Sequence, residues 1–135
     1  MIGAKAKIKF DARKIANAAK RGNITSVGHA AAAIRLRAWY SIRKSPKKSR
    51  VGMPPNSRKG RLRKALKYAV SKLPSGGVGA VIGPDIKVAG TSGKAHEFGG
   101  KYKRERFDRR PFMGPALDYV KPRMSAFWKN SIRGR

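Results

Sequence analysis

The 135-residue sequence has no cysteine, few acidic residues and no long apolar run. Without cysteine there can be no disulfide and no thiolate metal site. No stretch approaches the 18 or so apolar residues that a transmembrane helix needs. The opening residues, MIGAKAKIKF, also lack the continuous apolar core of a signal peptide. We therefore expect a soluble protein, made and used on the cytoplasmic side, with no membrane partner.

Positive charge dominates what is present. The chain has 34 Lys and Arg against 6 Asp and Glu, for a net charge of +28. Residues 12–84 contain no acidic residue and eighteen Lys or Arg. Such a field repels itself and attracts polyanions. The sequence therefore predicts a negatively charged partner, either nucleic acid or an acidic protein surface.

Hydrophobic periodicity predicts an α+β fold in a single domain spanning residues 1–135, because the length fits one domain. Helices are expected over 11–22, stopped by Gly22, and from about residue 24 to just before Pro46. A last helix should open at Gly114–Pro115 and kink or break at Pro122. Strands are expected at 4–10, 78–83 and 94–102, with a turn at Gly99–Gly100, whereas 61–72 fits either helix or strand. The expected architecture is a small, mostly antiparallel sheet packed against a long central helix, with a C-terminal helix and a long, flexible basic loop at 45–60.

Residue patterns for catalysis are missing. His29 and His96 do not form a metal-binding motif, and Asp85-Ile86-Lys87 resembles only half of a nuclease carboxylate signature. A turn after the preceding strand is the simpler interpretation of Asp85. We expect no catalytic residues, no metal and no cofactor.

The basic segments allow two interpretations. They can be a solvated face, or they can contact phosphates without sequence specificity. The candidate polyanion contacts are Lys47, Lys48, Arg50, Arg58, Lys59, Arg61, Arg63 and Lys64. Residues 101–110, KYKRERFDRR, also interleave Tyr102 and Phe107 with cations, which loosely resembles a base-stacking platform.

Two motifs near the C-terminus resemble a known family. AHEFGG at 95–100 is followed by RPFMGPALDYV at 110–120. This pair resembles the tail-completion, or head–tail joining, proteins of long-tailed bacteriophages, in which an E-F-G turn precedes an R-P-F-(L/M)-x-P-A-(L/I) block that opens the last helix. A weaker similarity covers PPNSRKGRLRKAL at 54–66, where Lys59 and Ala65 replace the family's Thr and Ser. The organisation is similar over about residues 24–132, but only the 95–120 pair is specific.

The resemblance implies a non-enzymatic virion protein of the head–tail interface, present in the host cytoplasm during assembly. It implies a homo-oligomeric ring, six- or twelve-fold, around the DNA channel, contacting neighbouring neck, portal-adaptor or tail-terminator proteins and, through some cations, the DNA end. Residues expected to dock a subunit or partner are Glu97, Phe98, Arg110, Pro111, Phe112, Met113 and Pro115.

Other interpretations remain open at this level. Phe112 could anchor a partner or fill the domain's own core. Glu97 could pair with Arg109 or Arg110 in the same subunit, or with a neighbouring copy. The alternative function is that of a sequence-independent DNA- or RNA-binding architectural protein.

Overall fold

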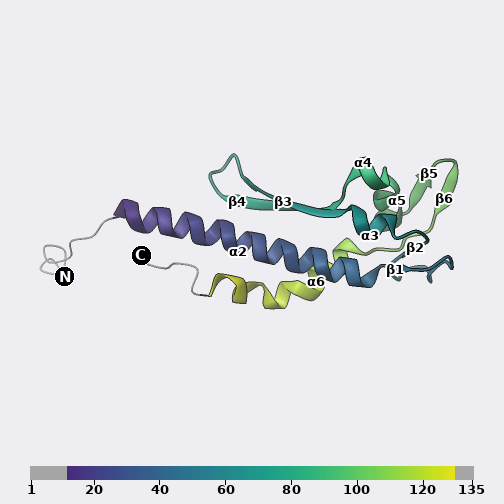
Figure 1. Ribbon diagram of the computed structural model, residues 1–135, viewed down its shortest axis with the longest axis horizontal. Helices are drawn as coiled ribbons and strands as arrows, with labels where there is room; N and C mark the ends of the chain where they lie inside the picture. The colour runs from purple at the N-terminus through teal and green to yellow at the C-terminus, as the bar shows by residue number, and fades with distance from the viewer. Residues whose placement is uncertain (1–11, 130–135) are drawn as a thin grey trace, which may run out of the picture.

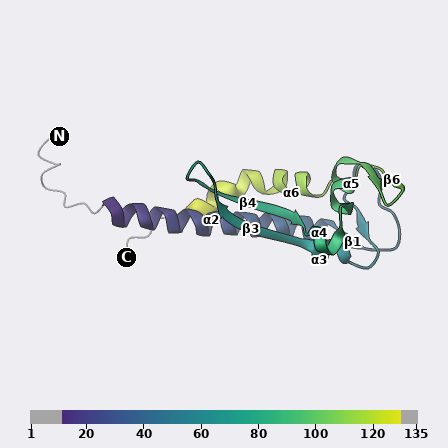
Figure 2. The same ribbon diagram turned by 90° about the horizontal axis from the view of Figure 1, so that it is seen from above.

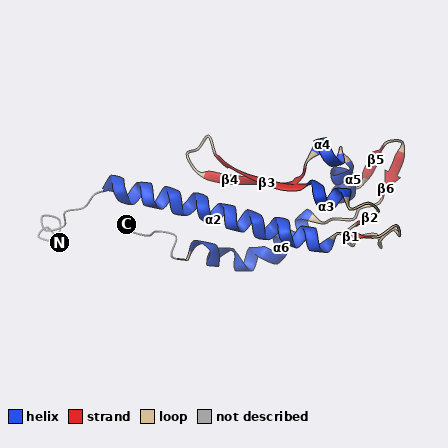
Figure 3. Cartoon of the chain, viewed as in Figure 1, coloured by secondary structure: helices blue, strands red, loops and turns tan. Residues whose placement is uncertain are grey.

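A long central helix lies between a β-hairpin and a C-terminal helical segment in the computed structural model, which describes residues 12–129. The β3–β4 hairpin contacts one side of helix α2, and α6 with its 3-10 continuation contacts another (Figures 1 and 2). Short helices and strands gather at one end of α2. This mixed helical and sheet content confirms the α+β class (Figure 3). The strand expected at 4–10 lies outside the described residues.

Helix α2 spans Ala12–Ser41, so the expected stop at Gly22 is wrong. A glycine inside a helix costs only about 1 kcal/mol relative to alanine and does not break it. Next to Gly22, Asn23 Oδ1 accepts a hydrogen bond from Trp128 Nε1 at 2.9 Å, which ties this part of α2 to the C-terminal segment. The helix ends before Pro46, as expected. Its buried face is Ala30, Ala31, Ile34 and Ala38.

The ambiguous segment 61–72 contains both candidate structures. Helix α3 spans Arg61–Ala65, and strand β3 follows directly over Leu66–Lys72. Strand β3 pairs antiparallel with β4, Val78–Pro84, which confirms the strand expected there. Leu62 and Ala65 are buried on the helix, and Leu66 is buried at the start of the strand. The segment fits both a helix and a strand because it contains one of each.

The other strands are short and do not join this hairpin. Strand β1, Arg43–Lys44, pairs parallel with β2, Asn56–Ser57, and β5, Gly100–Tyr102, pairs antiparallel with β6, Glu105–Phe107. The residues 12–129 thus form three separate two-stranded pairs rather than one sheet, two of them antiparallel.

The expected strand at 94–102 is wrong over its first half. Helix α4 spans Ile86–Ala89, and helix α5 spans Ser92–Phe98. Tertiary packing selects the helix, because Ala95 is buried and Gly93 lies against Pro84. A Cβ atom at Gly93 would collide with the Pro84 ring, so this close approach of α5 to the end of β4 requires glycine.

The loop at 45–60 packs against the segment that precedes the last helix. Gly52 N–H donates to the Arg109 carbonyl at 2.8 Å, and Arg110 Nε donates to the Ser49 carbonyl at 3.0 Å. Pro55 is fully buried. These contacts hold the basic loop next to the 109–112 segment.

Helix α6 spans Met113–Val120 and begins close to the expected Gly114–Pro115 start. It changes to a 3-10 helix, η1, over Lys121–Trp128, where Pro122 removes a backbone donor. The predicted break at Pro122 is therefore confirmed. No helix within residues 12–129 is long and apolar enough to cross a membrane.

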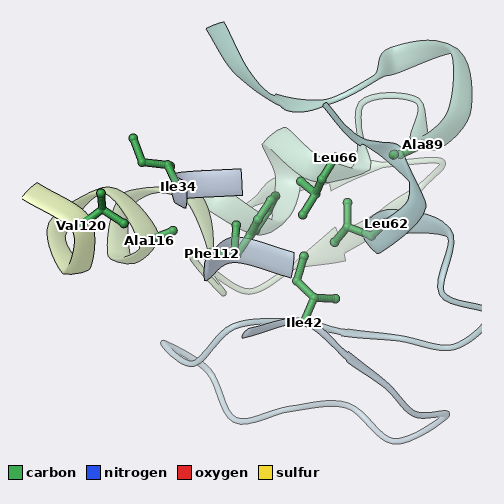
Figure 4. Packing of buried hydrophobic residues seen from close by; sticks show 10 residues of the cluster. Ile34, Ile42, Leu62, Leu66, Ala89, Phe112, Ala116 and Val120 are labelled. Atoms are coloured by element: carbon green, nitrogen blue, oxygen red, sulfur yellow. The ribbon is translucent and has the colours of Figure 1, made fainter. Parts of the chain in front are cut away.

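The core lies where α2, α3, β3 and α6 meet (Figure 4). Phe112 fills its centre, next to Ile42 and Leu66. Burying a side chain of this size contributes roughly 1.5–3 kcal/mol. The remaining buried members are Ile34, Ala38, Leu62, Ala65, Ala89, Ala116 and Val120.

Candidate partner-docking surface and basic pocket

Glu97, at the end of α5, caps the N-terminus of α6. Its Oε2 accepts hydrogen bonds from the backbone N–H of Phe112 at 2.8 Å and of Met113 at 2.9 Å, and its Oε1 accepts one from Gly114 at 2.8 Å. The first N–H groups of a helix have no partner within the helix, and the helix dipole favours negative charge there. A carboxylate fifteen residues upstream thus fixes the start of the last helix.

The expected pairing of Glu97 with Arg109 or Arg110 is not what holds this carboxylate. Arg109 Nε donates to the backbone carbonyl of Glu97 at 3.3 Å, and Arg110 Nε donates to Ser49. In the described part of the chain, the one ion pair joins Lys67 to Asp85 at 2.9 Å. Both arginines therefore lack a carboxylate partner between residues 12 and 129.

Phe112 is only 1% exposed, so in the single subunit it fills the core. Met113 and Pro111 are half-buried, and Pro115 is exposed. Phe98 is instead the most exposed large side chain of the two motifs, at 70%, compared with 44% for Leu117 and for Tyr119. Phe98 is therefore the candidate apolar anchor among the predicted docking residues.

Phe98 borders an apolar groove of about 360 Å³, which we call the Phe98 groove. Ile86, which is 69% exposed, and half-buried Met113 also line it. Lys94 and Glu97 are its charged residues. The other lining residues are Ile82, Gly83, Pro84, Gly90, Thr91, Gly93 and Phe112. Exposed aromatic and aliphatic side chains around a hollow are typical of protein–protein contact sites.

A second hollow, of about 380 Å³, is basic; we call it the basic pocket. It lies between the 45–58 loop, the end of α5 and the β6 segment. Its cationic residues are Lys47, Lys48, Arg58, Arg106 and Arg110. Its acidic residues, Glu105 and Asp108, form no ion pair with any residue between 12 and 129. The lining therefore carries an excess of positive charge that no close pairing neutralises.

Two polar atoms on residues that line the basic pocket are buried without a hydrogen-bond partner within residues 12–129: Ser49 Oγ and His96 Nδ1. Burial, with a smaller contribution from the charge of Arg110, lowers the pKa of His96 below its ordinary value. The imidazole is therefore neutral at pH 7. An unpaired buried polar group costs about 1–3 kcal/mol, so a ligand that pairs with these atoms would gain from it.

The predicted polyanion contacts separate into groups. Lys47, Lys48 and Arg58 line the basic pocket, whereas Arg50, Lys59, Arg61 and Lys64 are exposed outside it. The guanidinium of Arg63 lies 3.5 Å from the centre of the Trp39 ring. This cation–π contact ties Arg63 to the fold.

The stacking platform expected from Tyr102 and Phe107 is not open. Their rings pack against each other at 6.0 Å, and His96 meets Phe107 edge-to-face at 5.0 Å. Both rings are half-buried. Phe107 and His96 line the basic pocket, so the Phe107 ring belongs to its wall and is not a free face for stacking bases.

Asp85 is the N-cap of α4, as the turn interpretation anticipated in part. Its Oδ1 accepts a hydrogen bond from the Lys87 N–H at 2.9 Å. The hydrogen bond from Lys67, and then that from Lys87, lower the pKa of Asp85. Within residues 12–129, no three His, Asp or Glu side chains are grouped to hold a metal ion.

Sequence reasoning missed Ser49, His96 and Arg106 as neighbours of Lys47, Lys48 and Arg58. The basic run at 101–110 was visible, but its meeting with the loop depends on hydrogen bonds between residues about 60 positions apart. The chain matches no known family, and no curated protein or solved structure is significantly similar to it. The phage resemblance therefore rests on the sequence motifs alone.

Proposed function

We propose that this chain is a non-enzymatic structural subunit of the head–tail interface of a long-tailed bacteriophage, acting as a ring around the DNA channel. One observation carries the proposal: the two motifs of the resemblance form a single structural unit. Glu97 of the first motif holds three backbone N–H groups of the second, and this leaves Phe98 exposed at an apolar groove.

The contact between copies that we propose joins two different surfaces. Val51 and Met53, in the loop between β1 and β2, are 62% and 56% exposed. This loop and helices α4 and α5 lie on opposite sides of the same end of the molecule in the view of Figure 1. A head-to-tail contact between two such surfaces generates a ring when the rotation closes. The loop of one copy would place Val51 and Met53 in the Phe98 groove of the next.

Charge sets the conditions for this assembly. Copies that each carry +28 repel one another at low salt. Acidic surfaces of neighbouring neck, portal-adaptor or tail-terminator proteins, and the DNA end, would neutralise part of that charge in the particle. In their absence, salt can screen it, because the Debye length falls from about 10 Å at 0.1 M to about 3 Å at 1 M.

Sedimentation velocity of the purified chain at 0.1 M and 1 M NaCl tests the ring. We expect self-association to increase with salt and to be lost in Phe98→Ser and in Met53→Ser. Val81→Ser is the matched control, because Val81 is 75% exposed but does not line the groove. Equal loss in all three variants, or no self-association of the wild type at either salt concentration, would reject this contact.

The second candidate is a sequence-independent nucleic-acid-binding protein, which the basic pocket favours. Its salt dependence has the opposite sign. Binding to random duplex weakens as salt rises, with a slope of about −0.9 per neutralised phosphate. Association that strengthens with salt supports the ring, and duplex binding that persists at physiological salt supports the alternative.

A further inference from the structure

The basic pocket combines three features. Five Lys and Arg line one hollow of about 380 Å³, and they come from segments about 60 residues apart. The hollow is fixed by backbone-directed hydrogen bonds, in which Arg110 Nε donates to the Ser49 carbonyl and Arg110 N–H donates to the His96 carbonyl at 2.6 Å. Two of its residues, Ser49 and His96, also have buried polar atoms without partners.

We propose that the basic pocket binds a phosphate monoester, with Lys48, Arg58 and Arg110 supplying positive charge and Ser49 and His96 supplying hydrogen bonds. The same chemistry can come from the terminal phosphate of a nucleic-acid strand or from free phosphate or nucleotide. The inference does not depend on the virion role, because it rests only on the pocket's residues.

Charge selects the class of ligand. Five cations and two carboxylates line the pocket, and neither carboxylate is paired with a described residue. Glu105 and Asp108 are exposed, as are most of the cations, so the lining keeps a net charge of about +3. A phosphate monoester carries close to two negative charges at pH 7 and offers three acceptor oxygens. A backbone phosphodiester carries one charge and has a sugar on both sides.

Hydrogen bonding selects the same class. The Ser49 hydroxyl is a donor that rotates freely about its C–O bond, and a histidine ring nitrogen that carries a proton donates as well. A phosphate oxygen accepts from both and from guanidinium groups, and hydrogen bonds to a charged acceptor are the stronger kind. An apolar ligand would leave both buried atoms unpaired, and a cationic ligand would be repelled by the five Lys and Arg that line the pocket.

The experiment compares three probes in fluorescence anisotropy at fixed ionic strength. The probes are a single-stranded oligonucleotide with a 5′-phosphate, the same strand with a 5′-hydroxyl, and inorganic phosphate as a competitor. Together they distinguish binding of a strand end from binding of the phosphodiester backbone and of the free ion. We expect the 5′-phosphorylated strand to bind about tenfold more tightly than its 5′-hydroxyl counterpart, as one or two charge-assisted hydrogen bonds supply. Inorganic phosphate should remove that difference.

Charge-matched variants locate the site. Lys48→Gln/Arg58→Gln removes two cations from the pocket, and Lys59→Gln/Lys64→Gln removes two exposed cations that do not line it. The preference for the 5′-phosphate should disappear in the first variant and persist in the second. Both variants should lose similar affinity for the 5′-hydroxyl strand, since both lose two cations.

Ser49→Ala separates binding from folding. It removes a buried hydroxyl that has no partner, so the midpoint of thermal unfolding should stay unchanged or rise while the 5′-phosphate preference falls. Inorganic phosphate should raise the unfolding midpoint of the wild type and of Lys59→Gln/Lys64→Gln more than that of Lys48→Gln/Arg58→Gln. That result would support the pocket as a site for free phosphate even if the two oligonucleotides bind equally. The proposal is overturned if the two oligonucleotides bind equally and phosphate affects all variants alike.

Discussion

The carboxylate of Glu97 and the backbone N–H of Phe112 are 2.8 Å apart, and this hydrogen bond joins the end of α5 to the start of α6. The same carboxylate serves two further N–H groups of α6. Glu97 therefore positions the backbone of buried Phe112 and also caps helix α6. One of the six acidic residues of the chain thus has a structural role.

Replacing Glu97 should destabilise the protein in a graded way. Glu97→Ala removes three acceptor contacts at a helix N-terminus and should lower the free energy of unfolding by about 1–3 kcal/mol. Glu97→Gln keeps one oxygen and should cost less. Urea denaturation measures both. Glu105→Ala is the control, because this exposed carboxylate forms no ion pair within residues 12–129; a loss of similar size in the control would contradict the capping role.

Phe112 and Phe98 should behave in opposite ways. Phe112→Leu leaves a gap in the core and should cost about 1–2 kcal/mol of folding stability, because Phe112 is 1% exposed. Phe98→Ser should change stability by less than about 0.5 kcal/mol, because that ring is largely in water. Thermal unfolding and sedimentation on the same samples separate the two roles. A Phe98→Ser protein that unfolds as easily as Phe112→Leu would show that Phe98 belongs to the core.

His96 should make stability fall on acidification. Burial, and then Arg110, lower its pKa in the folded state, so the unfolded chain binds the proton more readily. The free energy of unfolding therefore rises with pH between the pKa of His96 in the folded state and its unfolded value of about 6.5. The stability that the neutral imidazole contributes is lost as pH falls through that window. In phosphate-free buffer, the wild type should lose more stability from pH 7 to pH 5 than His96→Asn. Parallel pH profiles for the two proteins would contradict a neutral, buried imidazole.

The β5–β6 turn should be a place where stability can be gained. Lys103 and Arg104 both have positive φ, at 48° and 67°, in a two-residue hairpin turn that favours Asn-Gly. Replacing them with Asn and Gly should raise the free energy of unfolding by about 1 kcal/mol. Lys59→Gln/Lys64→Gln removes the same charge without touching the turn, and an equal gain in that control would assign the effect to reduced repulsion.

Local signals in the sequence were sufficient for several elements. The apolar alternation of 78–83 gave a strand, the apolar spacing before Pro46 gave a long helix, and Pro122 marked the change from α6 to the 3-10 helix. Each of these depends on chain geometry within a few residues.

Tertiary contacts decided the elements that sequence reasoning missed. Helix α2 continues through Gly22 where Asn23 meets Trp128, which is 105 residues away. The 94–98 segment is helical where Gly93 packs on Pro84. The basic pocket likewise forms only where the 45–58 loop meets residues 106–110. These contacts join residues far apart in the chain, so no local sequence pattern predicts them.

The most direct test of the proposed function is quantitative mass spectrometry of phage particles purified from the culture that encodes the chain, measured against the portal subunit. We expect the chain to be present in a fixed ratio to the portal subunit, at the copy number of a six- or twelve-fold ring per particle. Absence from particles, with the chain recovered on intracellular nucleic acid instead, would contradict the proposed function and favour the nucleic-acid-binding alternative.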